Sequence, residues 1–283
     1  MSSTANGPRS LYLSIAGHEV HVTEWGDRDA PALVMWHGLA RVGRDFDTIA
    51  RQLAPMFHII CPDTIGRGLS SWSKDPQADY TIPAYCGHAI EMLDRLGLEQ
   101  VRWVGTSMGG IIGMALAGTK ETAGRIERLV INDVGPEINQ AAVDRIKAYV
   151  TMVPEFPSIA HFEAFLRIAY APFGKMTDAE WRLMTETSLR RRDNGTYSSH
   201  YDPAVMTVFA EHMDEFDMWD IYDAITCPTL LVRGETSDLL LAESAVKMTQ
   251  RGPCPALITI PGCGHAPALN TQDQVAVLKG FLA

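Results

Sequence analysis

The chain has 283 residues, 46% of them hydrophobic, so it is long enough to bury one large core and too apolar for a disordered or fibrous protein. It carries 24 basic and 34 acidic residues, a net charge of −10, which argues against a nucleic-acid-binding surface and favours a protein that handles small molecules. Five cysteines are scattered without C-x-x-C spacing, which disfavours a disulfide framework and a four-cysteine zinc site.

Signals for export or membrane insertion are absent from the sequence. The opening MSSTANGPRS has no basic region followed by an apolar segment, and no apolar run reaches membrane-spanning length. We therefore expect a cytoplasmic protein with neither a membrane nor a nucleic acid as its partner.

The hydrophobic pattern along most of the chain is that of alternating strands and helices. Residues 11–25 alternate apolar and polar side chains around Gly17, which predicts an antiparallel hairpin at a sheet edge. Short apolar runs that are typical of strands buried on both faces follow at 31–36, 58–62, 101–104, 128–134, 229–234 and 256–262. Amphipathic stretches separate most of them, so we expect parallel strands joined by helices.

The segment 135–223 departs from this pattern, because helical patterns follow one another there without a strand between them. Thr177 and Glu180 form a capping box that predicts a helix to about Arg190, and RRRDNGTY then predicts a turn. We predict a core domain of residues 1–134 and 224–283 and an inserted helical cap of residues 135–223.

The stretch VRWVGTSMGGIIG, residues 101–113, places Ser107 between a predicted strand and a predicted helix. Gly105 and Gly109 leave out side chains that would collide at a tight strand-to-helix turn, as a nucleophile elbow requires. The first N–H groups of the helix would face developing negative charge there. The pentapeptide alone is equally consistent with Ser107 as a simple helix cap.

A second segment that could belong to the same site is His37-Gly38-Leu39, directly after the strand at 31–36. A chain turn there can aim the Leu39 amide at a substrate oxygen beside the Met108 amide, which would form an oxyanion hole. The alternative is an ordinary turn in which His37 packs against the loop.

Two further loops carry the residue types that would activate a serine. Asp238 follows the strand at 229–234 and could orient an imidazole, with Glu235 as its local competitor. His265 lies in a Gly- and Pro-bounded loop after the last strand. The order Ser107, Asp238, His265 matches one known triad architecture, and the strand-end placement would bring the three to one sheet edge.

With these residues the chain resembles the α/β-hydrolase superfamily: HGL, PDTIGRG, GTSMGG, RGETSD and GCGHAP occur in that family's order and approximate spacing. The resemblance implies an α/β-hydrolase fold, with a mostly parallel eight-stranded sheet flanked by helices and a helical cap inserted after the sixth strand. It also implies Ser107 as nucleophile, His265 as base, Asp238 as orienting acid, and Leu39 with Met108 as donors of the oxyanion-hole amides.

Other members of the family leave alternatives open. Some relatives place the acid elsewhere, which makes Asp63 in PDTIGRG and Asp133 at the end of the sixth strand candidates ranked below Asp238. Dehalogenase and epoxide-hydrolase relatives carry an Asp nucleophile where this chain has Ser107, so alkyl-enzyme chemistry is not expected.

We therefore predict a carboxylic ester hydrolase that forms an acyl-enzyme and takes a small-molecule ester of small to medium acyl length, with no metal or organic cofactor. The alternatives are hydrolysis of carbon–carbon bonds in ring-fission products, and a ligand-binding receptor with slow hydrolysis. The carbon–carbon reaction would need a cationic anchor such as one of Arg190, Arg191 and Arg192.

The predicted cap is rich in large apolar side chains, most of which we expect to pack the cap itself and a few to line an acyl pocket. The candidates are Met152, Phe156, Phe162, Phe165, Tyr170, Phe173, Trp181, Met184, Met206 and Phe209.

Overall fold

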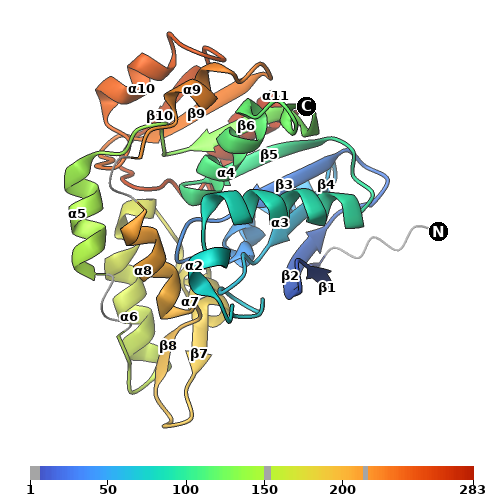
Figure 1. Ribbon diagram of the computed structural model, residues 1–283. Coiled ribbons are helices and arrows are strands. Elements are labelled where there is room, and N and C mark those ends of the chain that lie inside the picture. The colour runs from blue at the N-terminus through green and yellow to red at the C-terminus, as the bar shows by residue number, and fades with distance from the viewer. Residues whose placement is uncertain (1–6, 150–153, 213–215) are drawn as a thin grey trace.

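The computed structural model describes residues 7–149, 154–212 and 216–283. Its main sheet has eight strands in the order β1-β2-β4-β3-β5-β6-β9-β10 (Figure 1). The strands are β1 Arg9–Ile15, β2 His18–Trp25, β3 Ala32–Trp36, β4 His58–Pro62, β5 Val101–Thr106, β6 Ile126–Asn132, β9 Thr229–Gly234 and β10 Ala256–Ile260. Strand β2 runs antiparallel to β1 and β4, and every other pair is parallel. The predicted fold class is confirmed.

Helices cover both faces of this sheet. The helices outside the cap segment, together with α9, are η1 Gly43–Phe46, α1 Asp47–Leu53, α2 Pro76–Asp79, α3 Ile82–Arg95, α4 Met108–Gly118, η2 Ala123–Arg125, α9 Trp219–Asp223, α10 Ala242–Met248 and α11 Gln272–Leu282. Buried side chains of α3, α4, α9 and α10 form one core cluster with the sheet, and those of α1 and α11 form a second cluster. Alternate residues of β3 enter the two clusters, as the period of a strand requires.

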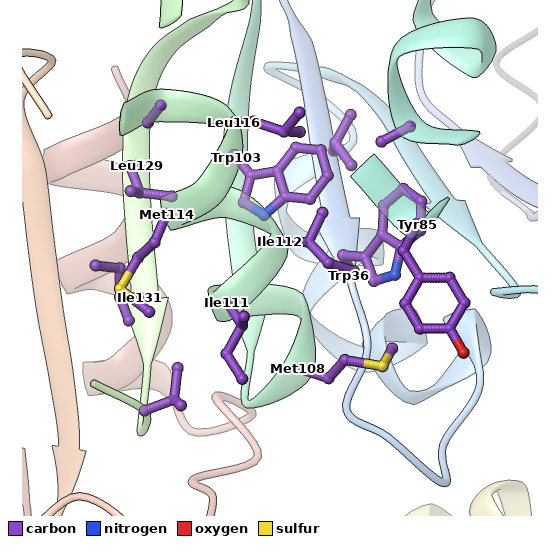
Figure 2. Close-up of a cluster of buried hydrophobic side chains, with 14 of the residues drawn as sticks. Trp36, Tyr85, Trp103, Met108, Ile111, Ile112, Met114, Leu116, Leu129 and Ile131 are labelled. Atoms are coloured by element: carbon purple, nitrogen blue, oxygen red, sulfur yellow. The ribbon is translucent and has the colours of Figure 1, made fainter. Parts of the chain in front are cut away.

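The largest cluster packs α4 tightly against the sheet (Figure 2). Trp36 on β3 and Trp103 on β5 stack with ring centroids 5.3 Å apart. A Cβ added at Gly113 of α4 would lie 2.6 Å from the Trp103 indole nitrogen, so only glycine allows this approach. The position of α4, and therefore of the residue before it, is fixed by this packing.

Most of the segment between β6 and β9 gathers on one side of the molecule (Figure 1). It contains α5 Gln140–Tyr149, α6 Ile159–Ala169, η3 Ala171–Phe173, α7 Asp178–Ser188, β7 Leu189–Arg191, β8 Tyr197–Ser199 and α8 Pro203–Glu211, followed by α9. The predicted capping box of Thr177 and Glu180 is present at the start of α7. The expectation of helices alone is wrong, because the turn after α7 closes the short antiparallel hairpin β7–β8.

Two details of the sequence prediction need adjustment. Helix α9 lies within 135–223 but packs over the sheet against α4, so close that a Cβ on Gly118 would lie 2.0 Å from the Ile221 carbonyl oxygen. Strand β10 is not buried on both faces; it is an edge strand with mostly half-exposed or exposed side chains.

None of the five cysteines forms a disulfide. No helix within the described residues is long and apolar enough to cross a bilayer.

Candidate active site

Ser107 lies at a strained turn between β5 and α4. Its backbone has φ 53° and ψ −116°, a conformation that non-glycine residues rarely adopt. A Cβ at Gly105 would lie 2.1 Å from the Gly109 carbonyl oxygen, and one at Gly109 would lie 2.1 Å from the Trp36 carbonyl oxygen. The two glycines therefore allow the sharp turn that the sequence predicts, with Ser107 at its apex.

The Ser107 side chain points to a histidine. Ser107 occupies the N-cap position of α4, but its hydroxyl makes no capping hydrogen bond. Its Oγ lies 2.9 Å from Nε2 of His265, which comes from the loop after β10. The alternative in which Ser107 only caps the helix is therefore wrong.

The carboxylate beside His265 is Asp133, where the sequence analysis preferred Asp238. Nδ1 of His265 lies 2.9 Å from Oδ2 of Asp133, the residue that follows β6. A carboxylate only accepts hydrogen bonds, so Nδ1 carries the proton and Nε2 is left to accept the Ser107 hydroxyl proton. Asp133 therefore lies where the sequence analysis placed Asp238, beside Nδ1 of His265.

Asp133 is held by groups from the neighbouring strand end. It is fully buried, and its backbone has φ 61°. Its Oδ1 accepts a hydrogen bond from the Gly234 amide at 2.7 Å, and its Oδ2 accepts one from the Ser237 hydroxyl at 2.6 Å. These bonds compensate the carboxylate for its burial and leave Oδ2 directed at His265.

The other candidate acids lie in different networks. Asp238 borders the cavity above the site, and its main-chain carbonyl accepts a hydrogen bond from Asn139. Glu235 accepts a hydrogen bond from the Gly262 amide. Asp63 lies 2.8 Å from Nδ1 of His21; burial alone would raise the Asp63 pKa, but this contact and a bond from a backbone amide hold the pKa below its usual value.

The loop after β3 comes close to the nucleophile. A Cβ on Gly38 would lie 3.6 Å from Cβ of Ser107, so the neighbouring Leu39 belongs to the rim of the site. Within the described residues, the Leu39 amide donates no hydrogen bond. The Met108 amide opens α4, where an N–H group has no acceptor inside the helix. Both predicted oxyanion-hole donors are thus available at this end of the sheet.

His37 itself has a structural role. It is completely buried, and its Nε2 accepts a hydrogen bond from the Thr64 amide at 2.9 Å while Nδ1 lies 2.7 Å from the Gly38 carbonyl oxygen. Burial lowers the pKa of His37 to about 4. His37 therefore packs against its surroundings, as the sequence analysis allowed, while the Leu39 amide of the same loop donates no hydrogen bond within the described residues.

A cavity of about 500 Å³ opens above Ser107 and His265, between the sheet edge and the segment 135–223. Of the candidate cap residues, five line it: Tyr170, Phe173, Met184, Met206 and Phe209. Phe162 and Trp181 belong to a hydrophobic cluster against which Phe156 and Phe165 pack; Met184 is part of the same cluster, and Tyr170 and Phe173 also pack against it. Met152 lies outside the described residues. Five of the nine described candidates thus line the cavity, more than the few that the sequence predicts, and three of the five also contribute to packing; the cavity wall is mainly apolar.

The cationic side chains of this cavity are ones that the sequence analysis missed. Arg41 and Arg44 line the cavity, whereas residues 190–192 do not. Arg41 is buried, lies 2.6 Å from Asp45, donates to the Ser188 hydroxyl at 2.9 Å and stacks over the Tyr170 ring. It thereby joins the loop after β3 to the segment between β6 and β9. Its distance along the chain from Ser188 hides this role in the sequence.

Within the described residues, no group of three or more His, Cys, Asp or Glu side chains is placed to bind a metal ion. His18 and His21, two histidines of β2, contact different aspartates: His21 lies 2.8 Å from Asp63 and His18 lies 3.1 Å from Asp79.

Comparison with known proteins places this geometry in a family. Residues 33–278 match the model of the alpha/beta hydrolase family. The chain belongs to that family. A 3-hydroxybutyrate-oligomer hydrolase of Cupriavidus necator is 38% identical over 280 residues, which cover 95% of this chain and 94% of the relative.

Two other proteins that resemble this chain support the assignment to the family. A pimeloyl-[acyl-carrier protein] methyl ester esterase of Xanthomonas campestris is 25% identical over 290 residues. The match covers 96% of this chain and 99% of that protein. The crystal structure of an alpha/beta hydrolase from Novosphingobium aromaticivorans superposes with a TM-score of 0.85, at 31% identity, over 97% of this chain and 98% of that one. The chain is accordingly a hydrolase of this family.

Proposed function

We propose that the protein is a serine hydrolase of carboxylic esters, in which Ser107 is the nucleophile, His265 the base and Asp133 the orienting acid. The observation that carries the proposal is the continuous line of hydrogen-bonded side chains from Asp133 through His265 to Ser107, at the floor of the cavity. Nucleophile, base and orienting group are each within hydrogen-bonding reach of the next, as acyl transfer requires.

In the first half of the proposed cycle, Ser107 Oγ attacks the ester carbonyl carbon while its proton passes to Nε2 of His265. The carbonyl oxygen becomes an oxyanion facing the Leu39 and Met108 amides. When this intermediate collapses, the carbon–oxygen bond to the leaving group breaks and His265 returns its proton to the departing alcohol. Asp133 stabilises the imidazolium that exists between these steps.

In the second half a water molecule attacks the acyl-enzyme, and its proton passes to His265. The new intermediate collapses, the bond to Ser107 Oγ breaks, and His265 returns the proton to that oxygen. The products are an alcohol and a carboxylic acid. Because the base must be neutral to accept a proton, turnover should fall as the imidazole becomes protonated in acid.

For the substrate class we propose short hydroxyacyl esters, with 3-hydroxybutyrate oligomers as the first candidates. The support is the relative that shares 38% identity over almost the full length of both chains. A cavity of about 500 Å³ with an apolar wall and few polar groups suits a short acyl chain.

The direct test is hydrolysis of 3-hydroxybutyrate dimer and trimer and of p-nitrophenyl esters of graded acyl length by the wild type, Ser107→Ala and Ser158→Ala. Ser158 is the matched control because it caps α6 at the protein surface. We expect turnover of the wild type and the control and none by Ser107→Ala. Ester turnover that survives in Ser107→Ala would contradict the assignment of Ser107 as the nucleophile. A silent wild type that cleaves dienoate ring-fission products would replace ester hydrolysis by carbon–carbon hydrolysis, and binding without turnover would indicate a receptor.

A further inference from the structure

Arg67, in the PDTIGRG loop after β4, is the one residue of that motif whose side chain reaches the predicted oxyanion hole. The side chain is completely buried. Its Nε donates to the Leu39 carbonyl oxygen at 2.8 Å, and one terminal nitrogen lies 3.5 Å from the Met108 sulfur. Leu39 and Met108 are the two residues whose amides would hold the oxyanion, so a single guanidinium contacts both of them.

The rest of the guanidinium is bound by neutral groups. Its other terminal nitrogen donates to the Ile65 carbonyl oxygen at 2.8 Å and to the Tyr85 hydroxyl at 2.6 Å. The tyrosine rings at 80 and 85 lie over the same group, with centroids 5.8 and 5.0 Å from it. Within the part of the chain that the structure describes, no carboxylate forms an ion pair with Arg67. An arginine keeps its charge when buried, so the PDTIGRG loop holds a full positive charge in the interior of the protein.

A buried charge without a counter-ion is unfavourable for folding, because water is removed from it and no opposite charge replaces the water. Its effect on neighbouring groups is correspondingly large, since solvent does not screen it. The charge acts on His37 in the loop after β3: burial is the main cause that lowers the His37 pKa, and the Arg67 charge lowers it further, while Asp63 and Asp45 act in the opposite direction. The N-terminus of α4 adds a potential of the same sign.

We propose that Arg67 is a positioning residue for the oxyanion hole and that its buried charge stabilises the oxyanion formed during ester cleavage. The inference rests on the proposed ester hydrolase function. Its hydrogen bond to the Leu39 carbonyl fixes the Leu39–Ala40 peptide, which directly follows the peptide that carries the Leu39 amide, and the guanidinium contributes positive potential where negative charge develops. Figure 2 shows Met108 and Tyr85 at the same end of the core cluster, the end where α4 begins.

A purely structural role for Arg67 would come from its loop, which also holds the cap. The Gly68 amide donates to the His200 carbonyl oxygen at 2.9 Å, and the Asp202 amide donates to the Gly66 carbonyl oxygen at 2.7 Å. Loss of these contacts would lower the stability of the fold or change the shape of the cavity. It would not selectively weaken an anionic transition state, and this difference separates the two roles.

The experiment compares the wild type with Arg67→Met and Arg67→Lys, and with Arg125→Met as the matched control. Arg125 also donates to backbone carbonyls, at the opposite end of the sheet before β6. The measurements are kcat and KM for p-nitrophenyl butyrate, the inhibition constant of a trifluoromethyl ketone that forms an oxyanion with Ser107, that of the corresponding methyl ketone, and the midpoint of thermal unfolding.

For Arg67→Met we expect kcat to fall about 10- to 100-fold, with KM changed less than about threefold, as for loss of an oxyanion-stabilising group. The trifluoromethyl ketone should bind more weakly by a similar factor, the methyl ketone should be unaffected, and Arg67→Lys should recover part of kcat. The Arg125→Met control should retain wild-type values.

The proposal is overturned if folded Arg67→Met keeps wild-type kcat, or if both ketones weaken equally. Should Arg67→Met fail to fold, Tyr85→Phe decides, because it removes one guanidinium acceptor. A severalfold lower kcat with parallel weakening of the trifluoromethyl ketone supports the proposal, and an unchanged kcat overturns it. Normal wild-type turnover with an unaffected Arg67→Met refutes only this inference, whereas a wild type inactive on esters refutes the proposed function as well.

Discussion

The loops after β6 and β9 both offer an aspartate at the same edge of the sheet, but only the first directs its carboxylate at His265. Asp133 follows β6 immediately, is fully buried and lies 2.9 Å from the imidazole. Asp238 lies four residues beyond the end of β9 and borders the cavity. The β9 loop instead supplies the Gly234 amide and the Ser237 hydroxyl, which hold Asp133. One loop carries the candidate acid and the other supports it.

The two loops should differ most in the loss of kcat that follows when the aspartate of each, Asp133 or Asp238, is replaced by asparagine. We expect Asp133→Asn to lower kcat on a p-nitrophenyl ester by about a thousandfold or more, because an amide at that position no longer fixes the His265 tautomer or stabilises the imidazolium. Asp238→Asn is the matched control, with kcat within about threefold of the wild type.

Circular dichroism and thermal unfolding of both variants establish that they are folded when kcat is compared. A large loss in Asp238→Asn with near-normal activity in Asp133→Asn would reverse the assignment and restore the acid that the sequence favoured.

The buried His37, in the loop after β3, predicts a pH effect on the stability of the fold. The pKa of His37 is lowered by burial from 6.5 to about 4, so between these values the unfolded chain binds a proton that the folded chain does not. The free energy of unfolding should therefore fall as pH drops from about 6.5 towards 4, with a contribution from His37 of about 3 kcal/mol.

Urea unfolding at pH 7, 6 and 5 measures this loss, and His37→Gln identifies its source. The glutamine retains an acceptor for the Thr64 amide and does not titrate. Burial also lowers the pKa of His88 and His200, so the difference in slope between the wild type and the variant isolates His37. Equal slopes in the two proteins would show that His37 does not stay neutral in the folded state.

A smaller effect should come from the support that the β9 loop gives to Asp133. Ser237→Ala removes the hydroxyl that donates to Oδ2 at 2.6 Å while leaving the Gly234 amide bond in place. We expect kcat to fall about tenfold, equivalent to about 1.4 kcal/mol, with KM nearly unchanged. A kcat equal to that of the wild type would show that the amide alone suffices to hold Asp133.

Much of the fold could be predicted from the sequence because local patterns determine it. The alternation around Gly17 specifies the first hairpin, and each predicted apolar run overlaps an observed strand. The turn at Ser107 was predictable for a steric reason, since Gly105 and Gly109 are the residues that allow it. The serine and the histidine were also assigned correctly to a shared sheet edge.

The acid could not be identified in the same way, because its identity depends on where two parallel strands end in space. Asp133 and Asp238 both follow strands, and nothing local distinguishes them. The deciding contacts join residues 101 to 132 positions apart, from Asp133 to Gly234 and to His265. The roles of Arg41 and Arg67 were missed for the same reason, since their partners come from distant segments.

The central claim is that His265 hydrogen-bonds to Asp133 through Nδ1. The most direct measurement is proton NMR of protein carrying ¹⁵N-labelled histidine, in which a proton held between an imidazole and a carboxylate gives a resonance at unusually low field. We predict that this Nδ1–H resonance is present in the wild type and in Asp238→Asn and absent in Asp133→Asn. Its persistence in Asp133→Asn together with its loss in Asp238→Asn would contradict the account.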